Sequence, residues 1–373
     1  MKIGIVGLPR SGKTTLLGAL TGFSAADAGN ARAVNQVIVT VPEPRLDRLY
    51  EIFQPRKKTP TSIEFVDLPG IQPAKPGIKT DTASVLGQVR QVDCLLLVLR
   101  AFDRSDDPHP AGSVDPARDL VNLRTELAFS DLEIVSGRIE RIDERLKRPI
   151  PQKERDELDA ERALIASVAA RLEAGGHVRD LAMQIEVEKK IRSFQLLRKK
   201  PEVVVVNTHD PKGGKVDDPE GVPQIGLSAE IERELLRLDG DDRTMFMSEY
   251  GLEKLSVDQV IRAAYRASGL ISFFTGGGPD EVRAWTLVEP ATAVDAAAAI
   301  HTDLATGFIR AEVVSFDDLS RCGDIKTAGQ VKPSSIPGMI FIDADGQKVY
   351  ETTLPLSGSL TDVVQKLNSE MDS

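Results

Sequence analysis

The segment MKIGIVGLPRSGKTTLLGAL, residues 1–20, is the most informative part of this 373-residue chain. Lys2 to Val6 are typical of a buried β-strand, and Thr14 to Leu20 have the apolar spacing of a helix. Every fixed position of the pattern G-x-x-x-x-G-K-[ST] is filled between them, by Gly7, Gly12, Lys13 and Thr14. The sequence therefore predicts an α/β fold with a phosphate-binding loop between its first strand and first helix.

The residue types in this loop suit a nucleoside triphosphate. Backbone N–H groups from Arg10 to Thr15 are expected to surround phosphate oxygens at the positive end of the helix. Lys13 would reach the outer phosphates, and the Thr14 hydroxyl would coordinate Mg²⁺. The loop residues predicted to bind nucleotide are Gly7, Arg10, Ser11, Gly12, Lys13, Thr14 and Thr15.

A second motif, D-x-x-G, follows the strand-like run SIEFV and spans Asp67 to Gly70. A carboxylate at this place in P-loop enzymes holds the Mg²⁺ shell, and the glycine N–H can contact the last phosphate. We therefore expect Asp67 and Thr14 to hold the metal, and Lys13, Asp67 and Gly70 to act in catalysis. Ile71 stands where Ras-like enzymes have a water-orienting glutamine, and Gln72 is one position late, so slow hydrolysis is expected.

A third motif follows the apolar run Val203 to Val206, which suits a central parallel strand. It reads Asn207-Thr208-His209-Asp210, an N-x-x-D pattern without the lysine of N-K-x-D. Asn207 would brace the phosphate loop, and Asp210 could accept hydrogen bonds from guanine, although the missing lysine weakens guanine selectivity. After a further strand at 224–227, a backbone N–H of Ser228-Ala229 is expected to meet the base oxygen. The predicted base-side residues are Asn207, Thr208, Asp210, Ser228 and Ala229.

The order of these motifs resembles a known family. The segments GLPRSGKTTLLGALTG, VPEPRLDRL, IEFVDLPG and AAYRASGLISFFT are similar to the YchF branch of the Obg-related P-loop NTPases, and VRAWTLVEPATAVDAAAAIHTDLATGFIRAEVVSFDDL resembles that family's C-terminal TGS domain. The resemblance covers residue 1 to about 320. It implies an NTPase that often prefers ATP to GTP, a hydrophobic residue in place of the catalytic glutamine, and association with ribosomes or stress responses.

Some positions depart from the family pattern and indicate a divergent subgroup. The family usually has asparagine and valine where this chain has Arg10 and Ser11. Ala31 falls about where the family has a metal-binding threonine, so a nucleotide-responsive switch is expected to be weak. Thr208 and Asp210 also differ from the family's usual base motif, which leaves the choice of base open.

The domain organisation that the resemblance implies is an NTPase domain over 1–117 and 201–278, interrupted by a helical coiled-coil hairpin over 118–200. A β-grasp, TGS-like domain follows over 279–373. Its end is atypical after residue 319, with a β-hairpin predicted at Asp345-Gly346 and a helix at 360–371.

Helical periodicity over 116–200, broken at 148–151 and at Gly175-Gly176, predicts two antiparallel arms. Basic side chains in this hairpin could meet an RNA backbone, or could form ion pairs with the interleaved glutamates. They are Arg138, Arg141, Arg145, Lys147, Arg148, Lys189, Lys190, Arg192 and Lys199.

Composition narrows the function classes. A net charge of −10 gives no global attraction to nucleic acid, and two cysteines supply neither a disulfide framework nor a metal set. The longest apolar run is too short for a membrane span, so a cytoplasmic protein without membrane contact is expected.

The sequence thus predicts a Mg²⁺-dependent NTPase of low turnover, with ATP preferred and with a ribosome or RNA as partner. Three alternatives stay open: a GTP-preferring translation GTPase, a small-molecule kinase, and a nucleotide-sensing scaffold that does not hydrolyse. The kinase is disfavoured by the D-x-x-G and N-x-x-D motifs, whereas Ala31 and Ile71 favour the scaffold.

Overall fold

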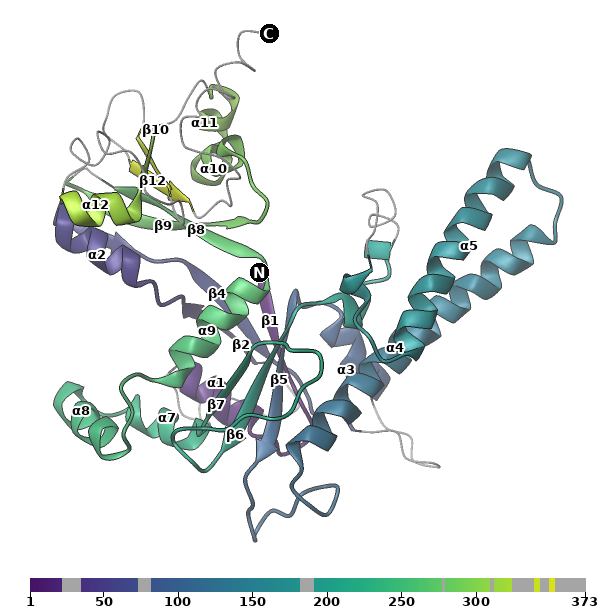
Figure 1. Ribbon diagram of the computed structural model, residues 1–373, viewed down its shortest axis with the longest axis horizontal. Coiled ribbons are helices and arrows are strands. Elements are labelled where there is room, and N and C mark those ends of the chain that lie inside the picture. Colours follow the sequence, from purple (N-terminus) through teal and green to yellow (C-terminus); the bar gives the residue numbers. More distant parts are fainter. Residues whose placement is uncertain are drawn as a thin grey trace. The chain divides into compact units, whose positions relative to one another are not determined.

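The computed structural model describes residues 1–21, 35–72, 82–181, 191–276, 279–308, 312–323, 339–342 and 349–352. The chain divides into two compact units (Figure 1). The first unit comprises Met1–Val39 and Glu64–Ala267, and the second comprises Thr40–Ile63 and Ser268–Ser373.

A six-stranded sheet in the order β2-β4-β1-β5-β6-β7 forms the centre of the first unit. Its strands are β1 (Lys2–Val6), β2 (Asn35–Thr40), β4 (Ser62–Asp67), β5 (Cys94–Ala101), β6 (Glu202–Thr208) and β7 (Gln224–Leu227). β1 pairs in parallel with β4 and β5, and parallel pairing continues through β6 to β7. The strands expected at Lys2–Val6, at Val203–Val206, at 224–227 and before the D-x-x-G motif are confirmed. The loops that follow parallel strands meet at one edge, which brings the predicted motifs together.

Helices cover both faces of this sheet. The helices are α1 (Lys13–Thr21), α3 (Thr82–Val89), α4 (Pro116–Leu146), α5 (Gln152–Glu173), α7 (Ala229–Leu235), α8 (Gly240–Glu249) and α9 (Ser256–Ala267). On one face, Leu95 and Leu97 of β5 form a buried core with α3 and with Leu120 and Leu123 of α4. Helix α9 packs against β5, β6 and β7, and it also contacts α1. Burial on both faces explains why β5 and β6 read as continuous apolar runs.

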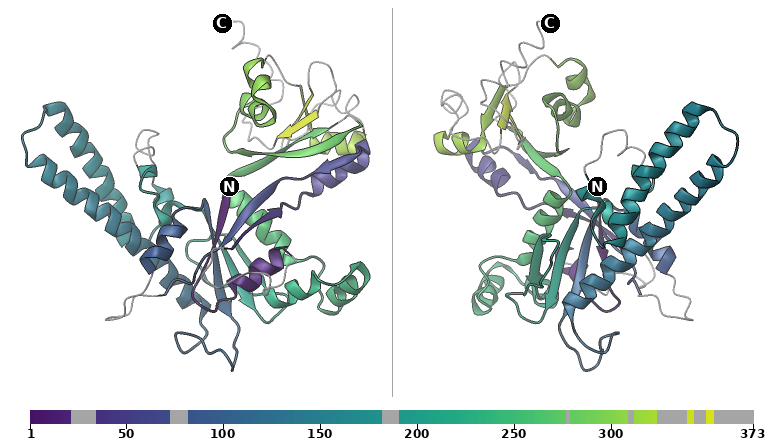
Figure 2. Two further views of the ribbon diagram at one scale, coloured as in Figure 1. Left: turned by 180° about the vertical axis from the view of Figure 1, so that it is seen from behind. Right: turned by 45° about the vertical axis from the view of Figure 1, so that its right-hand side comes forward.

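The helical hairpin expected between the second and third motifs is formed by α4 and α5, which lie side by side in Figure 2. Asp115 caps α4 by accepting from the N–H of Arg118 at 3.0 Å, and Pro116 is the first helical residue. The predicted break at 148–151 separates the arms, and α5 begins directly after Pro151. Short 3₁₀ turns follow at Val178–Asp180 and Leu197–Lys199. No helix in the described ranges is both long enough and apolar enough to cross a membrane.

Several basic side chains of the hairpin are engaged in intramolecular ion pairs. The pairs are Arg138–Glu161 (2.8 Å), Arg145–Glu154 (2.7 Å) and Lys147–Glu144 (2.5 Å). For these three residues the structure therefore favours the ion-pair alternative over an open basic face. Lys189 and Lys190 lie outside the described residues.

The second unit is built on a mixed sheet in the order β10-β11-β12-β8-β9-β3. Its strands are β3 (Lys57–Thr59), β8 (Leu270–Gly276), β9 (Glu281–Val288), β10 (Glu312–Ser315), β11 (Met339–Ile342) and β12 (Val349–Thr352). α10 (Ala293–Ile300) is packed against Ile271, Phe273 and Leu287, and α11 (Thr302–Thr306) follows it. The strands on either side of the hairpin predicted at Asp345-Gly346 pair antiparallel, whereas that turn and the helix predicted at 360–371 lie outside the described residues.

Two boundaries differ from those expected from the sequence. Residues 40–63 and 268–276 fall within the NTPase domain that the sequence predicts, but they lie in the second compact unit. The reason is long-range packing: β8 pairs antiparallel with β9, and α2 (Pro44–Phe53) buries Leu46 and Leu49 in one core with Phe274 and with α12 (Phe316–Cys322). The second unit is thus assembled from two separate parts of the chain.

Candidate nucleotide-binding site

The loop between β1 and α1 requires its two glycines. A Cβ atom on Gly7 would lie 2.5 Å from the carbonyl oxygen of Val98, which is shorter than any normal contact. Gly12 has a φ of 89°, and a Cβ there would overlap the side-chain amide of Asn207. The spacing in the motif therefore follows from backbone geometry and from close packing against β5 and β6.

Arg10 occupies a left-handed backbone conformation, with a φ of 66°. Asparagine, which the family usually has here, adopts this conformation more readily than arginine does. The side chain of Arg10 forms an ion pair with Asp107 at 2.7 Å and donates to the carbonyl oxygen of Pro108 at 3.3 Å. These contacts fix the side chain of Arg10 outside the phosphate loop, while its backbone N–H remains part of the loop.

Lys13 is enclosed by the loop to which it belongs. Its Nζ donates to the carbonyl oxygens of Leu8 at 2.9 Å and Gly7 at 3.3 Å. Burial lowers the pKa of Lys13 to about 8, and the charge of Asp67 opposes that shift only in part. A cationic donor is therefore held in the loop, partly stripped of water and able to exchange carbonyl partners for phosphate oxygens.

Thr14 and Asp67 lie together, as expected of two residues that hold one metal ion. The Thr14 hydroxyl donates to Oδ2 of Asp67 at 2.7 Å. Oδ1 of Asp67 is buried and has no hydrogen-bond partner among the described residues. Burial raises the pKa of Asp67, while the Thr14 hydrogen bond and the charge of Lys13 act against that rise. A carboxylate oxygen without a partner, next to a hydroxyl, is a donor set that suits Mg²⁺.

The D-x-x-G segment packs directly on the phosphate loop. A Cβ on Gly70 would lie 2.7 Å from the backbone nitrogen of Pro9, and the N–H of Ile71 donates to the carbonyl oxygen of Gly7 at 3.1 Å. The side chain of Ile71 is fully buried in the core with α3. Gln72 is exposed, and its carbonyl oxygen accepts from the Thr82 hydroxyl at 3.0 Å. The residue in the glutamine position thus points into the core and away from solvent.

Asn207 joins the phosphate loop to the base side of the site. Its Nδ2 donates to the carbonyl oxygen of Ser11 at 3.1 Å, and its Oδ1 accepts from the N–H of Ala229 at 3.1 Å. The bracing role expected of Asn207 is therefore visible in the structure. The Ala229 N–H, part of the pair expected to meet the base oxygen, is bonded to Asn207.

The remaining base-side residues are arranged around a tight turn. The Thr208 hydroxyl accepts from the N–H of Asp210 at 3.1 Å, and Oδ1 of the exposed Asp210 accepts from the N–H of Lys212 at 2.9 Å. Ser228 is buried and caps α7 through Ile231. Asp210 is therefore open to solvent, whereas Ser228 has a structural task. Ala31 lies outside the described residues.

Comparisons with known proteins agree with this arrangement. A family model described as "50S ribosome-binding GTPase" matches residues 2–129, and the YchF-GTPase C-terminal model, described as a protein of unknown function, matches residues 270–350. The "Ribosome-binding ATPase YchF" of Haemophilus ducreyi is 34% identical over 94% of this chain and 98% of its own length. The chain belongs to the YchF family.

Other relatives extend this placement. The "Ribosome-binding ATPase YchF" of Bacillus subtilis is 33% identical over 93% of this chain and 97% of its own, and "Obg-like ATPase 1" of Oryza sativa subsp. japonica is 32% identical over 94% and 91%. The solved YchF GTPase of Schizosaccharomyces pombe, 28% identical, has a TM-score of 0.74 over 88% of this chain and 91% of its own. The predicted YchF branch and the predicted P-loop fold are therefore confirmed.

Sequence reasoning missed one cluster of this YchF-family site. Arg100, at the end of β5, donates from Nε to the carbonyl oxygen of Phe102 at 3.1 Å and from Nη2 to that of Asp107 at 2.6 Å, and its guanidinium lies 4.8 Å from the Phe102 ring centroid. The Phe102 ring contacts His209, with centroids 5.4 Å apart. Phe102 is also 3.9 Å from the Cβ position of Gly12, beside Asn207. Its position directly after a parallel strand is the signal that could have found it.

Proposed function

We propose that this YchF-family protein binds a nucleoside triphosphate, ATP in preference to GTP, together with Mg²⁺, and hydrolyses it slowly. The observation that carries the proposal is the cluster of Lys13, Thr14 and Asp67, in which Oδ1 of Asp67 is buried without a hydrogen-bond partner among the described residues. A buried carboxylate oxygen without a partner destabilises the folded protein, and a bound cation would remove that unfavourable term.

The residues of the chain would divide the work as follows. Thr14 and Asp67 would hold the metal, which would supply positive charge to offset the charge of the phosphate groups. Lys13 and the backbone N–H groups of the loop stabilise the charge that develops on the transferred phosphoryl group. Gly70 allows the D-x-x-G loop to lie against Pro9, so that its N–H can approach the last phosphate. The buried side chain of Ile71 cannot orient water, which supports a low turnover.

The preference for ATP is supported by the base side of the site. Thr208 replaces the lysine of N-K-x-D, so the contact that favours guanine in that motif is missing. The ring of Phe102, 3.9 Å from the Cβ position of Gly12, could stack on either purine and adds affinity without selecting the base. Relatives that cover nearly the whole chain are named ATPases. A GTP-preferring enzyme is the second candidate, favoured by the exposed carboxylate of Asp210.

The cellular role that we propose is that of a cytoplasmic, ribosome-associated regulatory NTPase. The support is the printed name of the bacterial relatives, "Ribosome-binding ATPase". The helical hairpin and the TGS-like domain that we propose over 279–373 are the proposed contacts with the ribosome or its RNA.

Calorimetry with nucleotide-free protein tests the proposal. We expect ATP to bind more tightly than GTP, both only with Mg²⁺, and Asp210→Ala to leave the ATP affinity unchanged. Asp241→Ala, an exposed aspartate on α8, is the matched control. Loss of a GTP preference in Asp210→Ala would instead assign the protein to the GTPases.

Release of phosphate from ATP should occur without any acceptor, which separates hydrolysis from a kinase reaction. Lys13→Ala should abolish it. Tight nucleotide binding without phosphate release, even with ribosomes present, would replace the enzyme by a nucleotide-sensing scaffold.

A further inference from the structure

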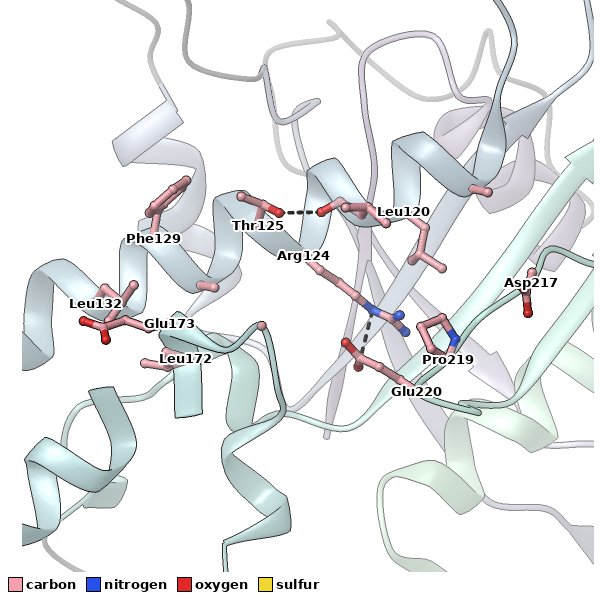
Figure 3. A pocket seen from close by; sticks show the side chains of 14 residues that line it. Leu120, Arg124, Thr125, Phe129, Leu132, Leu172, Glu173, Asp217, Pro219 and Glu220 are labelled. Atoms are coloured by element: carbon pink, nitrogen blue, oxygen red, sulfur yellow. Dashed lines mark hydrogen bonds and ion pairs between the residues drawn. The ribbon is translucent and has the colours of Figure 1, made fainter. Parts of the chain in front are cut away.

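A groove of about 420 Å³ lies at the base of the helical hairpin, lined by none of the predicted nucleotide-site residues. Its walls are α4, the end of α5 and the segment 217–220 between β6 and β7 (Figure 3). The volume lies in the range of about 300–1,000 Å³ that is usual for binding sites. The groove is therefore large enough to receive bulky side chains from another molecule.

The groove combines a buried apolar floor with exposed apolar side chains. Leu120 and Leu172 line it and are almost fully buried. Val121 and Phe129 also line it, and they are 61% and 60% exposed. Together with Thr125 they recur every four residues on one face of α4. Large apolar side chains left exposed beside a cavity are a feature of protein-binding surfaces.

The one arginine among the lining residues is already neutralised. Nε of Arg124 donates to Oε2 of Glu202 at 3.0 Å, and Nη1 donates to Oδ1 of Asp218 at 2.5 Å. Arg124 also approaches Glu220 at 3.5 Å, a contact drawn in Figure 3. The groove therefore gains no outward positive charge from this residue.

Carboxylates determine the charge at the rim. Glu173 and Asp217 line the groove, are exposed, and form no ion pair within the described part of the chain. Burial alone would raise the pKa of Glu220, but the hydrogen bond from His177 and the charges of Arg198 and Arg124 lower it to about 2. Glu220 is therefore a carboxylate that is already paired with basic side chains, and the acidic side chains left to face a partner at the rim are Glu173 and Asp217.

The cluster of His177, Glu202 and Glu220 next to the groove is not suited to binding a metal ion. His177, Glu202 and Glu220 converge within 4.8 Å, as in some metal sites. However, Arg198 donates to both glutamates, to Glu220 at 2.5 Å, so a metal ion there would face a guanidinium. The cluster is an ion-pair network that fixes the floor of the groove.

We propose that this groove is the docking site for a partner protein that inserts a large apolar side chain flanked by lysine or arginine. The apolar floor would bury the anchor, and the exposed rim carboxylates of Glu173 and Asp217 would pair with the basic flanks. An RNA backbone would meet these carboxylates with like charge. The docking site is independent of nucleotide hydrolysis.

A titration of the full-length protein tests this proposal with three fluorescently labelled probes read by anisotropy. The probes are a short amphipathic helix of leucine and lysine, the same peptide with each lysine replaced by glutamate, and a single-stranded oligouridine RNA. We expect saturable binding of the basic peptide, and binding of the other two weaker by at least about tenfold, which is about 1.4 kcal/mol.

Variants locate the binding on the groove. Phe129→Asp, and separately the double variant Glu173→Lys with Asp217→Lys, should each weaken the basic peptide at least about tenfold. Met245→Asp, at a methionine that is 58% exposed on α8, should leave it unchanged. All positions are exposed, and an unchanged affinity for nucleotide confirms that each variant is folded.

Three outcomes would overturn the proposal: no saturable binding of the basic peptide, equal binding of the acidic peptide or the RNA, or full binding by the groove variants. None of these depends on hydrolysis, so the proposed NTPase activity can stand or fall separately.

Discussion

Raising the pH from 7.5 to 9 should weaken the affinity for a nucleoside triphosphate about eightfold, or about 1.3 kcal/mol. The cause is the burial of Lys13, which lowers its pKa from 10.5 to about 8 in the unliganded protein. The lysine is then about three-quarters protonated at pH 7.5 and about one-tenth protonated at pH 9. Phosphate oxygens favour the charged form, so the complex holds Lys13 protonated at both pH values. Binding therefore takes up a proton, and affinity falls as the pH rises through 8.

Calorimetry of ATP binding in buffers of different ionisation enthalpy measures both quantities. At pH 8.5 the uptake should be about 0.8 proton per nucleotide bound. Lys13→Arg is the control, because its guanidinium stays protonated across this range and both the slope and the uptake should vanish. Affinity of the wild type that does not change with pH would refute the reasoning, and so would an unchanged slope in Lys13→Arg.

The unliganded protein should respond to pH with the opposite sign. The unfolded chain keeps the ordinary lysine pKa of 10.5, whereas the folded chain has about 8, so protonation favours unfolding. The contribution of Lys13 to stability is unfavourable below pH 8 and improves as the pH rises toward 10.5. As the pH rises above 8, nucleotide binding should therefore weaken while the contribution of Lys13 to the free energy of unfolding becomes more favourable. Alkaline denaturation would instead lower both the affinity and the stability.

Three substitutions test other parts of the site and its support. Gly70→Ala places a Cβ 2.7 Å from the backbone of Pro9, which must then move, so phosphate release should drop at least about tenfold and the melting temperature should fall as well. Phe102→Ala should weaken ATP about tenfold, as expected for one lost base-stacking contact, but should leave tripolyphosphate binding unchanged in the same titration. Glu202→Gln removes a fully buried carboxylate that pairs with Arg124 and Arg198, and it should lower the free energy of unfolding in urea by about 3 kcal/mol. Glu154→Gln, in an exposed ion pair with Arg145, is the control and should lower it by less than about 1 kcal/mol.

The phosphate loop could be predicted from the sequence because its motif records backbone geometry. Gly7 has no room for a side chain next to Val98, and Gly12 has none next to Asn207. Such constraints fix both the residue type and the spacing, so they are visible without coordinates. The strands before each motif were predictable for a related reason, since burial on both faces makes them continuously apolar.

Other features depend on contacts between residues far apart in the sequence. The segment 40–63 belongs to the second unit because Leu46 and Leu49 pack with Phe274, more than two hundred residues later. Helical periodicity predicts that α2 has an apolar face, but it does not say which sheet covers that face. The same holds for Phe102, whose relation to Gly12 and His209 arises only when β1, β5 and β6 are placed side by side.

The burial of Ile71 adds a structural reason to the chemical one why the residue at this position does not orient water. Its N–H is bonded to the carbonyl oxygen of Gly7, and Gly70 before it touches Pro9, so the backbone at this point is fixed against the phosphate loop. With the backbone fixed, the side chain at position 71 enters the core with Val85 and Leu86. A glutamine there would bury its amide in an apolar core instead of reaching the site. The backbone arrangement that holds Gly70 against the phosphate loop, where we propose that its N–H meets the last phosphate, therefore also directs the side chain of residue 71 into the core.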